Sequence, residues 1–180
     1  MGHSTTYLGR LDVTPPLNAS EIGWLRAYAA ADRRCYSDTY DVAMNPRAHA
    51  REVYAAAEAS PQRSPFTELL SRRQEAPGAR CDWVPCGEGC CLSWQRTEKS
   101  NIGEQWLRFI VDHFLRPNAH ASSSMNADFE AFTFDHVASG TIAAERDDSR
   151  ELYLIRAEDN AIWTETLVRG DLMPWERERT

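Results

Sequence analysis

The 180-residue sequence has no excess of basic residues, no long apolar run and almost no lysine. Its formal net charge is −7, and Lys99 is the only lysine. General binding to nucleic acid or to an anionic membrane needs a basic footprint, so the composition argues against both. Docking to a basic protein surface and a local patch of arginines remain open. We therefore expect a protein partner, and no direct sequence-specific contact with nucleic acid.

The sequence also lacks the segments that direct a chain into or across a membrane. Residues 1–13 contain no apolar run of the signal-peptide type, and no stretch is long enough to span a bilayer. We therefore expect a cytoplasmic protein. In that compartment thiols stay reduced, so clustered cysteines more often bind a metal or carry out redox chemistry than form structural disulfides.

Familiar catalytic and nucleotide-binding motifs are missing as well. There is no G-x-S-x-G, no H-E-x-x-H, no phosphate loop and no dinucleotide fingerprint. His136 directly follows Asp135, and alternation along a strand would place the two side chains on opposite faces. This argues against a simple acid–base pair, and we expect a non-enzymatic protein.

The first third of the sequence predicts a strand followed by a helix. Residues 5–14 alternate apolar and polar side chains, as a strand with one buried face does. Asn18 and Glu21 then form a capping-box pattern that opens an apolar helical stripe. Residues 33–79 differ in composition, and we interpret them as a helical insertion or a mobile segment. Within them, short helices are expected from Pro46 and from Pro65.

A longer helix is expected in the second half of the sequence. Asn101 is placed to cap it, and Glu104 would complete a capping box. The apolar side chains of residues 106–115 fall on one helical face, and Pro117 ends the pattern. His113 lies off that face, so we expect it in solvent.

The remaining sequence alternates with period two and predicts an antiparallel meander. Turns are expected at residues 138–140 and at residues 158–160. The strands that flank them are expected at residues 129–137, 140–146, 151–157 and 161–168. The whole chain, residues 1–180, is predicted to be a single α+β domain: one twisted antiparallel β-sheet with helices packed on one side. Residues 171–180 are charged and are expected to be a frayed tail.

Four of the five cysteines fall within residues 81–94, CDWVPCGEGCCLSW. Two short strands joined by a glycine-rich turn would bring Cys86, Cys90 and Cys91 together, because glycine tolerates positive φ angles. Thiolates favour zinc or a comparable thiophilic metal, and a structural zinc site uses four ligands. Cys81 is the first candidate for the fourth ligand.

Two other interpretations of the cysteines remain open. Cys86 or Cys90 could serve a thiol-dependent redox protein, although the loop leads into a strand and not into a helix start. Alternatively, all four thiols are small buried side chains with no shared ligand. Cys35 lies far from the cluster and is interpreted as an ordinary thiol. If a metal binds without Cys81, His113 and His120 are the remaining candidates for its fourth ligand.

Several motifs resemble a family of small uncharacterised actinobacterial and phage-borne proteins. They are PGARCDWVPC, WLRFIVDHFLRPNA, FDHVASGTIAAE and EDNAIW. The resemblance covers about the first thirty residues and residues 77–166, and the family has no established activity. It implies that Cys81 belongs to the shared pattern, whereas Cys86, Cys90 and Cys91 are particular to one branch. The mycobacterial members of that branch imply an adaptor on the small ribosomal subunit, where CGEGCC senses zinc and a hibernation factor is recruited under zinc starvation.

These observations favour a cytoplasmic adaptor or regulatory protein whose cysteine loop binds zinc. Metal binding would order a loop that is otherwise mobile and would change any partner surface beside it. The alternatives are a thiol-dependent redox protein and a phage or mobile-element accessory protein that binds a host protein.

Overall fold

The computed structural model describes residues 4–59, 75–96 and 99–170. The predicted helix from Pro65 and the predicted tail at residues 171–180 lie outside these ranges. Six strands form one antiparallel sheet in the order β2-β3-β1-β4-β5-β6. The strands are β1 (Thr5–Thr14), β2 (Trp83–Pro85), β3 (Cys91–Trp94), β4 (Val137–Arg146), β5 (Leu152–Glu158) and β6 (Ala161–Val168). The predicted fold class is confirmed.

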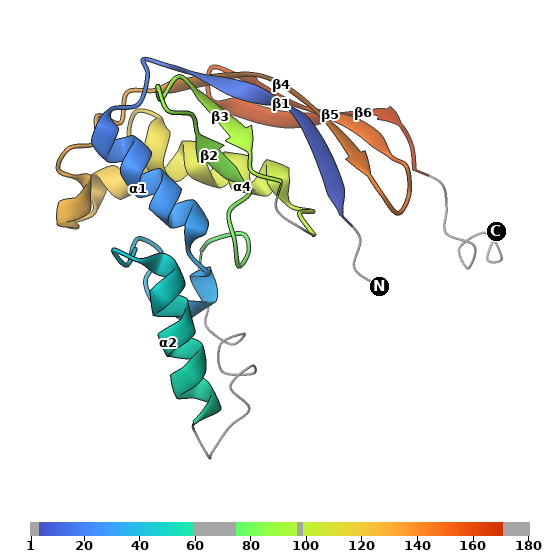
Figure 1. Ribbon diagram of the computed structural model, residues 1–180. Helices are drawn as coiled ribbons and strands as arrows, with labels where there is room; N and C mark the ends of the chain where they lie inside the picture. The colour runs from blue at the N-terminus through green and yellow to red at the C-terminus, as the bar shows by residue number, and fades with distance from the viewer. Residues whose placement is uncertain (1–3, 60–74, 97–98, 171–180) are drawn as a thin grey trace.

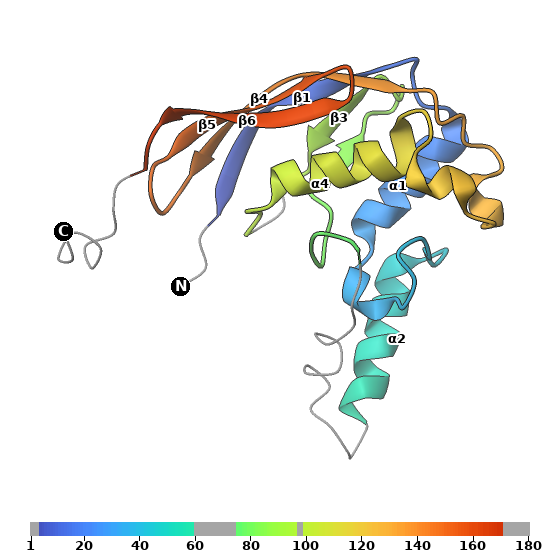
Figure 2. The ribbon, with the colours of Figure 1, turned by 180° about the vertical axis from the view of Figure 1, so that it is seen from behind.

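The helices lie on one side of this sheet. They are α1 (Ala19–Ala30), α2 (Pro46–Glu58) and α4 (Gly103–Ile110), which continues into a wider π-helical turn over Val111–Leu115. Figures 1 and 2 show α1 and α4 beneath the curved sheet, whereas α2 projects away from it below α1. The sheet and the helices α1 and α4 therefore form a two-layer core, and α2 extends from one end of it.

The alternation of the strand sequences decides which face is buried. Leu11 on β1, Ile142 on β4 and Ile155 on β5 are fully buried against the helical layer, where Trp106 and Leu107 of α4 are also fully buried. Each fully buried large apolar side chain contributes about 1.5–3 kcal/mol relative to exposure. The two edge strands also contribute to this core, through Trp83 of β2 and Ile162 of β6.

The start of α1 is as predicted, whereas the start of α4 is not. The side chain of Asn18 accepts hydrogen bonds from the amides of Ser20 and Glu21, and the Glu21 carboxylate accepts one from the Asn18 amide. The prediction that Asn101 caps α4 is wrong, because Ile102 occupies the cap position without a side-chain hydrogen bond.

Two other interactions replace that cap. The hydroxyl of Thr5 on β1 donates to the side-chain oxygen of Asn101 (3.3 Å). The amide of Gly103, the first residue of α4, donates to the hydroxyl of Tyr7 (3.0 Å). The start of α4 is therefore fixed by β1, nearly a hundred residues earlier in the sequence.

The strand predicted at residues 129–137 is also wrong. Residues 127–129 form a short 3₁₀ turn, and regular pairing begins at Val137. The alternating phenylalanines Phe132 and Phe134 imitate a strand, but they belong to an aromatic cluster around Trp24 on α1. The turn predicted at residues 138–140 is a continuous part of β4, which pairs with β1 along its full length.

A second, smaller apolar cluster joins α2 to the end of α1. Cys35 and Tyr36 are buried there, and Val53 and Tyr54 of α2 pack against them. The predicted helix from Pro46 is confirmed, with the side chain of Asn45 accepting a hydrogen bond from the Ala48 amide. Cys35 is thus a packing residue of this cluster.

Candidate metal centre

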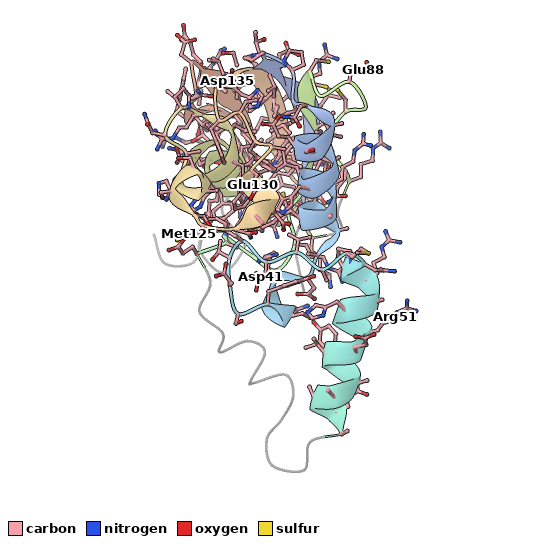
Figure 3. All side chains as sticks on the ribbon, turned by 90° about the vertical axis from the view of Figure 1, so that its left-hand side faces the viewer. Asp41, Arg51, Glu88, Met125, Glu130 and Asp135 are labelled. Carbon is pink, nitrogen blue, oxygen red and sulfur yellow. The ribbon has the colours of Figure 1, made fainter. Side chains whose placement is uncertain are left out.

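The cysteine loop, residues 86–90, is the connection of the β2–β3 hairpin. The Cys86 amide donates to the carbonyl of Cys91 (3.0 Å), and the Gly89 amide donates to the carbonyl of Cys86 (3.3 Å). These two hydrogen bonds close the loop on itself. Figure 3 shows Glu88 at the outer end of this loop, beside α1.

The cysteine loop also docks on the chain that connects β1 to α1. The Val13 amide donates to the Cys90 carbonyl (2.8 Å), and the Leu17 amide donates to the Gly89 carbonyl (3.0 Å). Gly89 has a φ of +70°, and a Cβ atom added there would lie 2.4 Å from the Leu17 carbonyl oxygen. Only glycine satisfies both this backbone conformation and this close approach. The docking of the loop on residues 13–17 therefore uses main-chain bonds and not its thiols.

Three thiols converge within this frame. The sulfurs of Cys86 and Cys90 lie 3.5 Å apart, and those of Cys86, Cys90 and Cys91 all lie within 4.8 Å of one another. Zinc–sulfur bonds of about 2.3 Å at tetrahedral angles place sulfurs about 3.8 Å apart. The three sulfurs thus fit three corners of a tetrahedral thiophilic-metal site after small movements. Cys91 is buried, Cys86 is half-buried and Cys90 is exposed, so the fourth corner can face solvent or a partner.

The three thiols do not share their acidity equally. Burial raises the pKa of Cys86, but hydrogen bonds with the thiols of Cys91 and Cys90 and with the amides of Glu88 and Cys91 lower it more, to about 6. Burial, together with the hydrogen bond to Cys86, raises the pKa of Cys91 to about 11. One negative charge is therefore stabilised in the cluster at neutral pH, and this charge gives a cation its first ligand.

Cys81, the expected fourth ligand, is not brought into this group. Its side chain is buried, and its sulfur lies 3.4 Å from the carbonyl oxygen and 3.5 Å from the amide nitrogen of Trp83. Burial raises the pKa of the Cys81 thiol to about 12. Cys81 is thus part of the apolar core under β2, at the other end of the strand from the loop.

The histidines considered as the fourth ligand lie elsewhere. The prediction that His113 is solvated is wrong: its ring is buried, stacks on Phe109 at 4.0 Å and lies 2.9 Å from the Tyr40 hydroxyl. Burial, and then the charge of His120, lower the pKa of His113 to about 4. His120 lies against His113, with ring centroids 4.4 Å apart. Among the described residues, no histidine, cysteine or carboxylate joins the three thiols as a fourth ligand.

Sequence reasoning missed one buried polar cluster, formed by Glu21, Thr133 and His136. The Glu21 carboxylate accepts from the amide and hydroxyl of Thr133 and lies 3.1 Å from Nε2 of His136, whose Nδ1 lies 2.7 Å from the Pro15 carbonyl. Both Glu21 and His136 are at most 1% exposed. A substrate cannot reach them, so this cluster joins α1 to the start of β4 and does not act as an acid–base pair. The partners are 115 residues apart, which no local pattern reveals.

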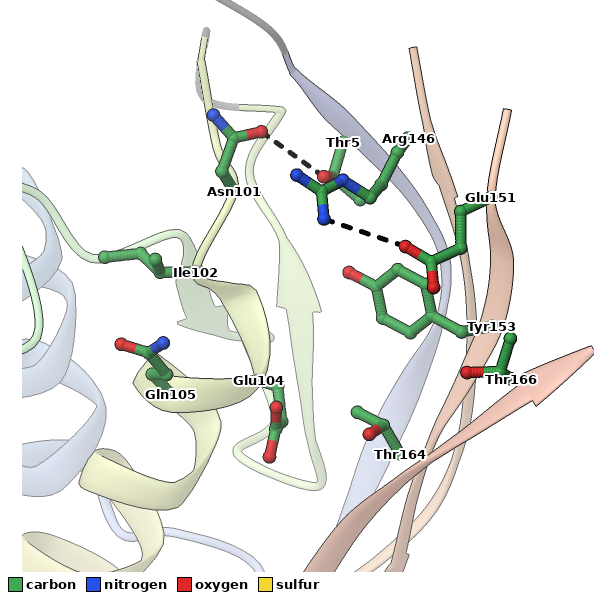
Figure 4. A pocket seen from close by; sticks show the side chains of 10 residues that line it. All are labelled: Thr5, Asn101, Ile102, Glu104, Gln105, Arg146, Glu151, Tyr153, Thr164 and Thr166. Carbon is green, nitrogen blue, oxygen red and sulfur yellow. Dashed lines mark hydrogen bonds and ion pairs between the residues drawn. The ribbon is translucent and has the colours of Figure 1, made fainter. Parts of the chain in front are cut away.

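A polar depression of about 190 Å³ lies between the start of α4 and β4–β6 (Figure 4). Arg146 and Glu151 form an ion pair at 3.6 Å on the sheet side of this depression, and Thr5 and Asn101 form a hydrogen bond nearby. Burial raises the pKa of Tyr153 at its centre. Four of the polar side chains in this depression are thus paired with one another, and the thiols remain the better candidate for chemistry.

Comparison of the chain with known proteins found no similar protein. No family model, no curated protein and no solved structure matches the chain. The description of the site therefore depends on its own residues. The described residues include no helix that is both long enough and apolar enough to cross a membrane.

Proposed function

We propose that the protein is a non-enzymatic adaptor whose cysteine loop binds zinc and reports metal status to a protein partner. The observation that carries this proposal is the convergence of three thiols, one of them exposed, on a loop fixed by main-chain bonds. Three thiolates and one open corner suit a site that water completes in the free protein and that a partner's side chain completes in a complex. Zinc would then link the loop to that partner directly.

The test is the zinc content of the full chain, purified under reducing conditions and measured by elemental analysis. We expect one zinc per chain, and loss of that zinc when Cys86, Cys90 and Cys91 are changed together to serine. Cys81→Ala is the matched control, because it removes a thiol of the same hairpin without touching the loop. A zinc content near zero in the unaltered chain contradicts the proposal, and loss of zinc in Cys81→Ala contradicts the ligand set.

The partner is the part of the proposal that the resemblance described above supports. We propose a basic protein surface of the small ribosomal subunit, together with a hibernation factor, because the chain itself carries a net charge of −7. Co-sedimentation with small subunits, with and without a zinc chelator, tests this step. Recovery of the chain with subunits in a zinc-dependent amount supports it, and absence of the chain from the subunit fraction in both conditions contradicts it.

A second candidate function, a thiol-dependent redox protein, has an observation of its own. The Cys86 and Cys90 sulfurs are 3.5 Å apart, and the pKa of Cys86 is lowered to about 6. Thiolates are the nucleophiles in thiol chemistry, so Cys86 would react at neutral pH. Its alkylation rate in the metal-free protein should rise around pH 6. A rise only near the reference pKa of about 8.5 counts against this candidate.

A further inference from the structure

A groove of about 470 Å³ lies between the end of α1 and the first turns of α2. Arg47, Arg51 and Arg80 line it together with Asp32 and the ring of Tyr54, and three alanines complete its apolar part. In a chain with a net charge of −7, three arginines around one groove are a marked local reversal of charge.

The sequence of α2 produces this arrangement. Arg47, Ala50, Arg51 and Tyr54 are spaced i, i+3, i+4 and i+7, so they share one face of the helix. Arg47 and Arg51 are thus neighbours of like charge, a pairing that destabilises an isolated helix. No acidic residue stands three or four positions from either of them. Figure 3 shows Arg51 projecting from the side of α2.

The arginines of this groove differ from several other arginines of the chain in whether they form an ion pair with a carboxylate. Arg34, Arg108 and Arg156 each form an ion pair with a carboxylate. Among the residues that the structure describes, no carboxylate forms an ion pair with any of the three groove arginines.

The one acid in the lining, Asp32, is already matched. Its carboxylate receives two hydrogen bonds from the Arg34 guanidinium (2.9 and 2.7 Å) and one from the Tyr54 hydroxyl (2.8 Å). These bonds, which outweigh the effect of burial, hold the pKa of Asp32 below its usual value. Within the described part of the chain, the groove therefore presents three arginines without a carboxylate partner, beside an Asp32 carboxylate that Arg34 and Tyr54 already satisfy.

We propose that this groove binds a small phosphorylated molecule of about mononucleotide size through its phosphate groups. Guanidinium groups bind phosphate by paired, charge-assisted hydrogen bonds, and Arg is favoured over Lys wherever that planar fork is used. The volume lies within the range of ligand pockets, about 300–1,000 Å³. The alanines and the Tyr54 ring offer an apolar surface to the remainder of the ligand. This site is separate from the cysteine loop and does not depend on its metal.

The test is calorimetric titration of the full chain with pyrophosphate and, in a second arm, with a nucleoside 5′-diphosphate. Saturable binding of either ligand is expected, and tighter binding of the nucleotide would assign the apolar part of the groove to the nucleoside. Changing Arg47 and Arg51 together to alanine should weaken binding by about tenfold or more for each arginine, because each charge-assisted contact is lost. Arg51→Lys keeps the charge but not the fork, and an intermediate loss is expected.

Arg150→Glu, at the exposed β4–β5 turn, is the control. It changes the net charge of the chain by as much as the double alanine variant does, and it should bind both ligands as the unaltered chain does. The double alanine variant should unfold at the same temperature or slightly higher, since it removes a like-charge pair. A structural role for the arginines would instead lower that temperature. The proposal is overturned by absence of saturable binding at millimolar concentrations of both ligands, by equal affinity in the double variant, or by binding of an RNA oligonucleotide alone.

Discussion

The two hairpins at opposite edges of the sheet use their connections differently. In the β5–β6 hairpin, Asp159 and Asn160 turn the chain with φ angles of 47° and 70°, the left-handed conformation of tight hairpin turns. The Asn160 side chain then accepts from the Ala138 amide (2.7 Å) and donates to the His136 carbonyl (3.0 Å). The side chain of this turn is therefore committed to the fold.

The β2–β3 hairpin is held as firmly, but by its backbone. Its five-residue connection is bonded through main-chain groups to Val13, Leu17 and itself, and its three thiols are engaged only with one another and with nearby amides. A loop that is fixed without its side chains leaves them available for a ligand. This contrast, more than the number of cysteines, makes the first hairpin the better candidate for a metal site.

The largest expected effect is that of zinc on the first hairpin. A ligand that binds only the folded state at 1,000 times its Kd stabilises that state by about 4 kcal/mol. Urea unfolding with and without zinc should show this gain in the unaltered chain. Cys90→Ser should lose most of the gain, because a thiolate ligand is removed. An equal gain in the variant with Cys86, Cys90 and Cys91 all changed to serine would contradict the difference proposed between the two hairpins.

The docking of the cysteine loop on Leu17 gives the next effect. Gly89→Ala places a Cβ against the Leu17 backbone at a φ of +70°, and we expect a loss of about 2–3 kcal/mol in the free energy of unfolding. Gly87→Ala is the matched control within the loop, because its added Cβ meets nothing within 4 Å. Zinc affinity should fall with Gly89→Ala alone. Equal behaviour of the two variants would show that the docking does not support the site.

A smaller effect is expected at the second hairpin. Asn160→Ala removes two hydrogen bonds and places alanine in the left-handed region, so the expected cost is about 2 kcal/mol. Asn160→Gly keeps the backbone conformation available and should cost about half as much. The zinc stoichiometry should stay unchanged in both variants. A change in it would show that the β5–β6 hairpin also supports the metal site.

The smallest effect concerns pH and the residue between the hairpins, His136. Although burial opposes it, the hydrogen bond to Glu21 raises the pKa of His136 above 6.5. Its contribution to stability is therefore full below pH 6.5, the unfolded value, and is lost as the pH rises through the raised folded value. The unaltered chain should thus lose more stability than His136→Gln between pH 6 and pH 8.

His113 does not disturb this measurement, although it titrates in the opposite direction. Its pKa is lowered to about 4, so its contribution is lost as the pH falls below 6.5. It contributes equally in the unaltered chain and in His136→Gln, and the difference between the two isolates His136. A pH dependence that is the same in both would show that folding does not raise the pKa of His136.

Local patterns predicted the fold well wherever a buried face repeats regularly. The alternation around Leu11 and Val13, the cap at Asn18 and the Asp159–Asn160 turn are all local features, and each is found in the structure. The pattern failed at Phe132 and Phe134, because Phe132 packs on Trp24 and Phe134 packs on Phe132 without forming a strand.

The site was predictable only in part for the same reason. The inner thiols Cys86, Cys90 and Cys91 are neighbours in sequence, so their convergence needs only one glycine turn. The separation of Cys81 from them depends on Trp83 and the core, which no spacing shows. The buried polar cluster of Glu21, Thr133 and His136 depends on contacts between residues far apart in the sequence.

The position of β1 in the sheet has a consequence for when the metal site can be made. β1 pairs with β3 on one side and with β4 on the other. The hydrogen-bonding partners that dock the cysteine loop, Val13 and Leu17, both precede the loop in the chain. A growing polypeptide therefore holds every element of the thiol site once β3 has been synthesised, while β4, β5 and β6 are still to come. Zinc bound at that stage would favour early pairing of β1 with β3. The zinc supply would then affect the folding of the chain during its synthesis as well as the folded protein.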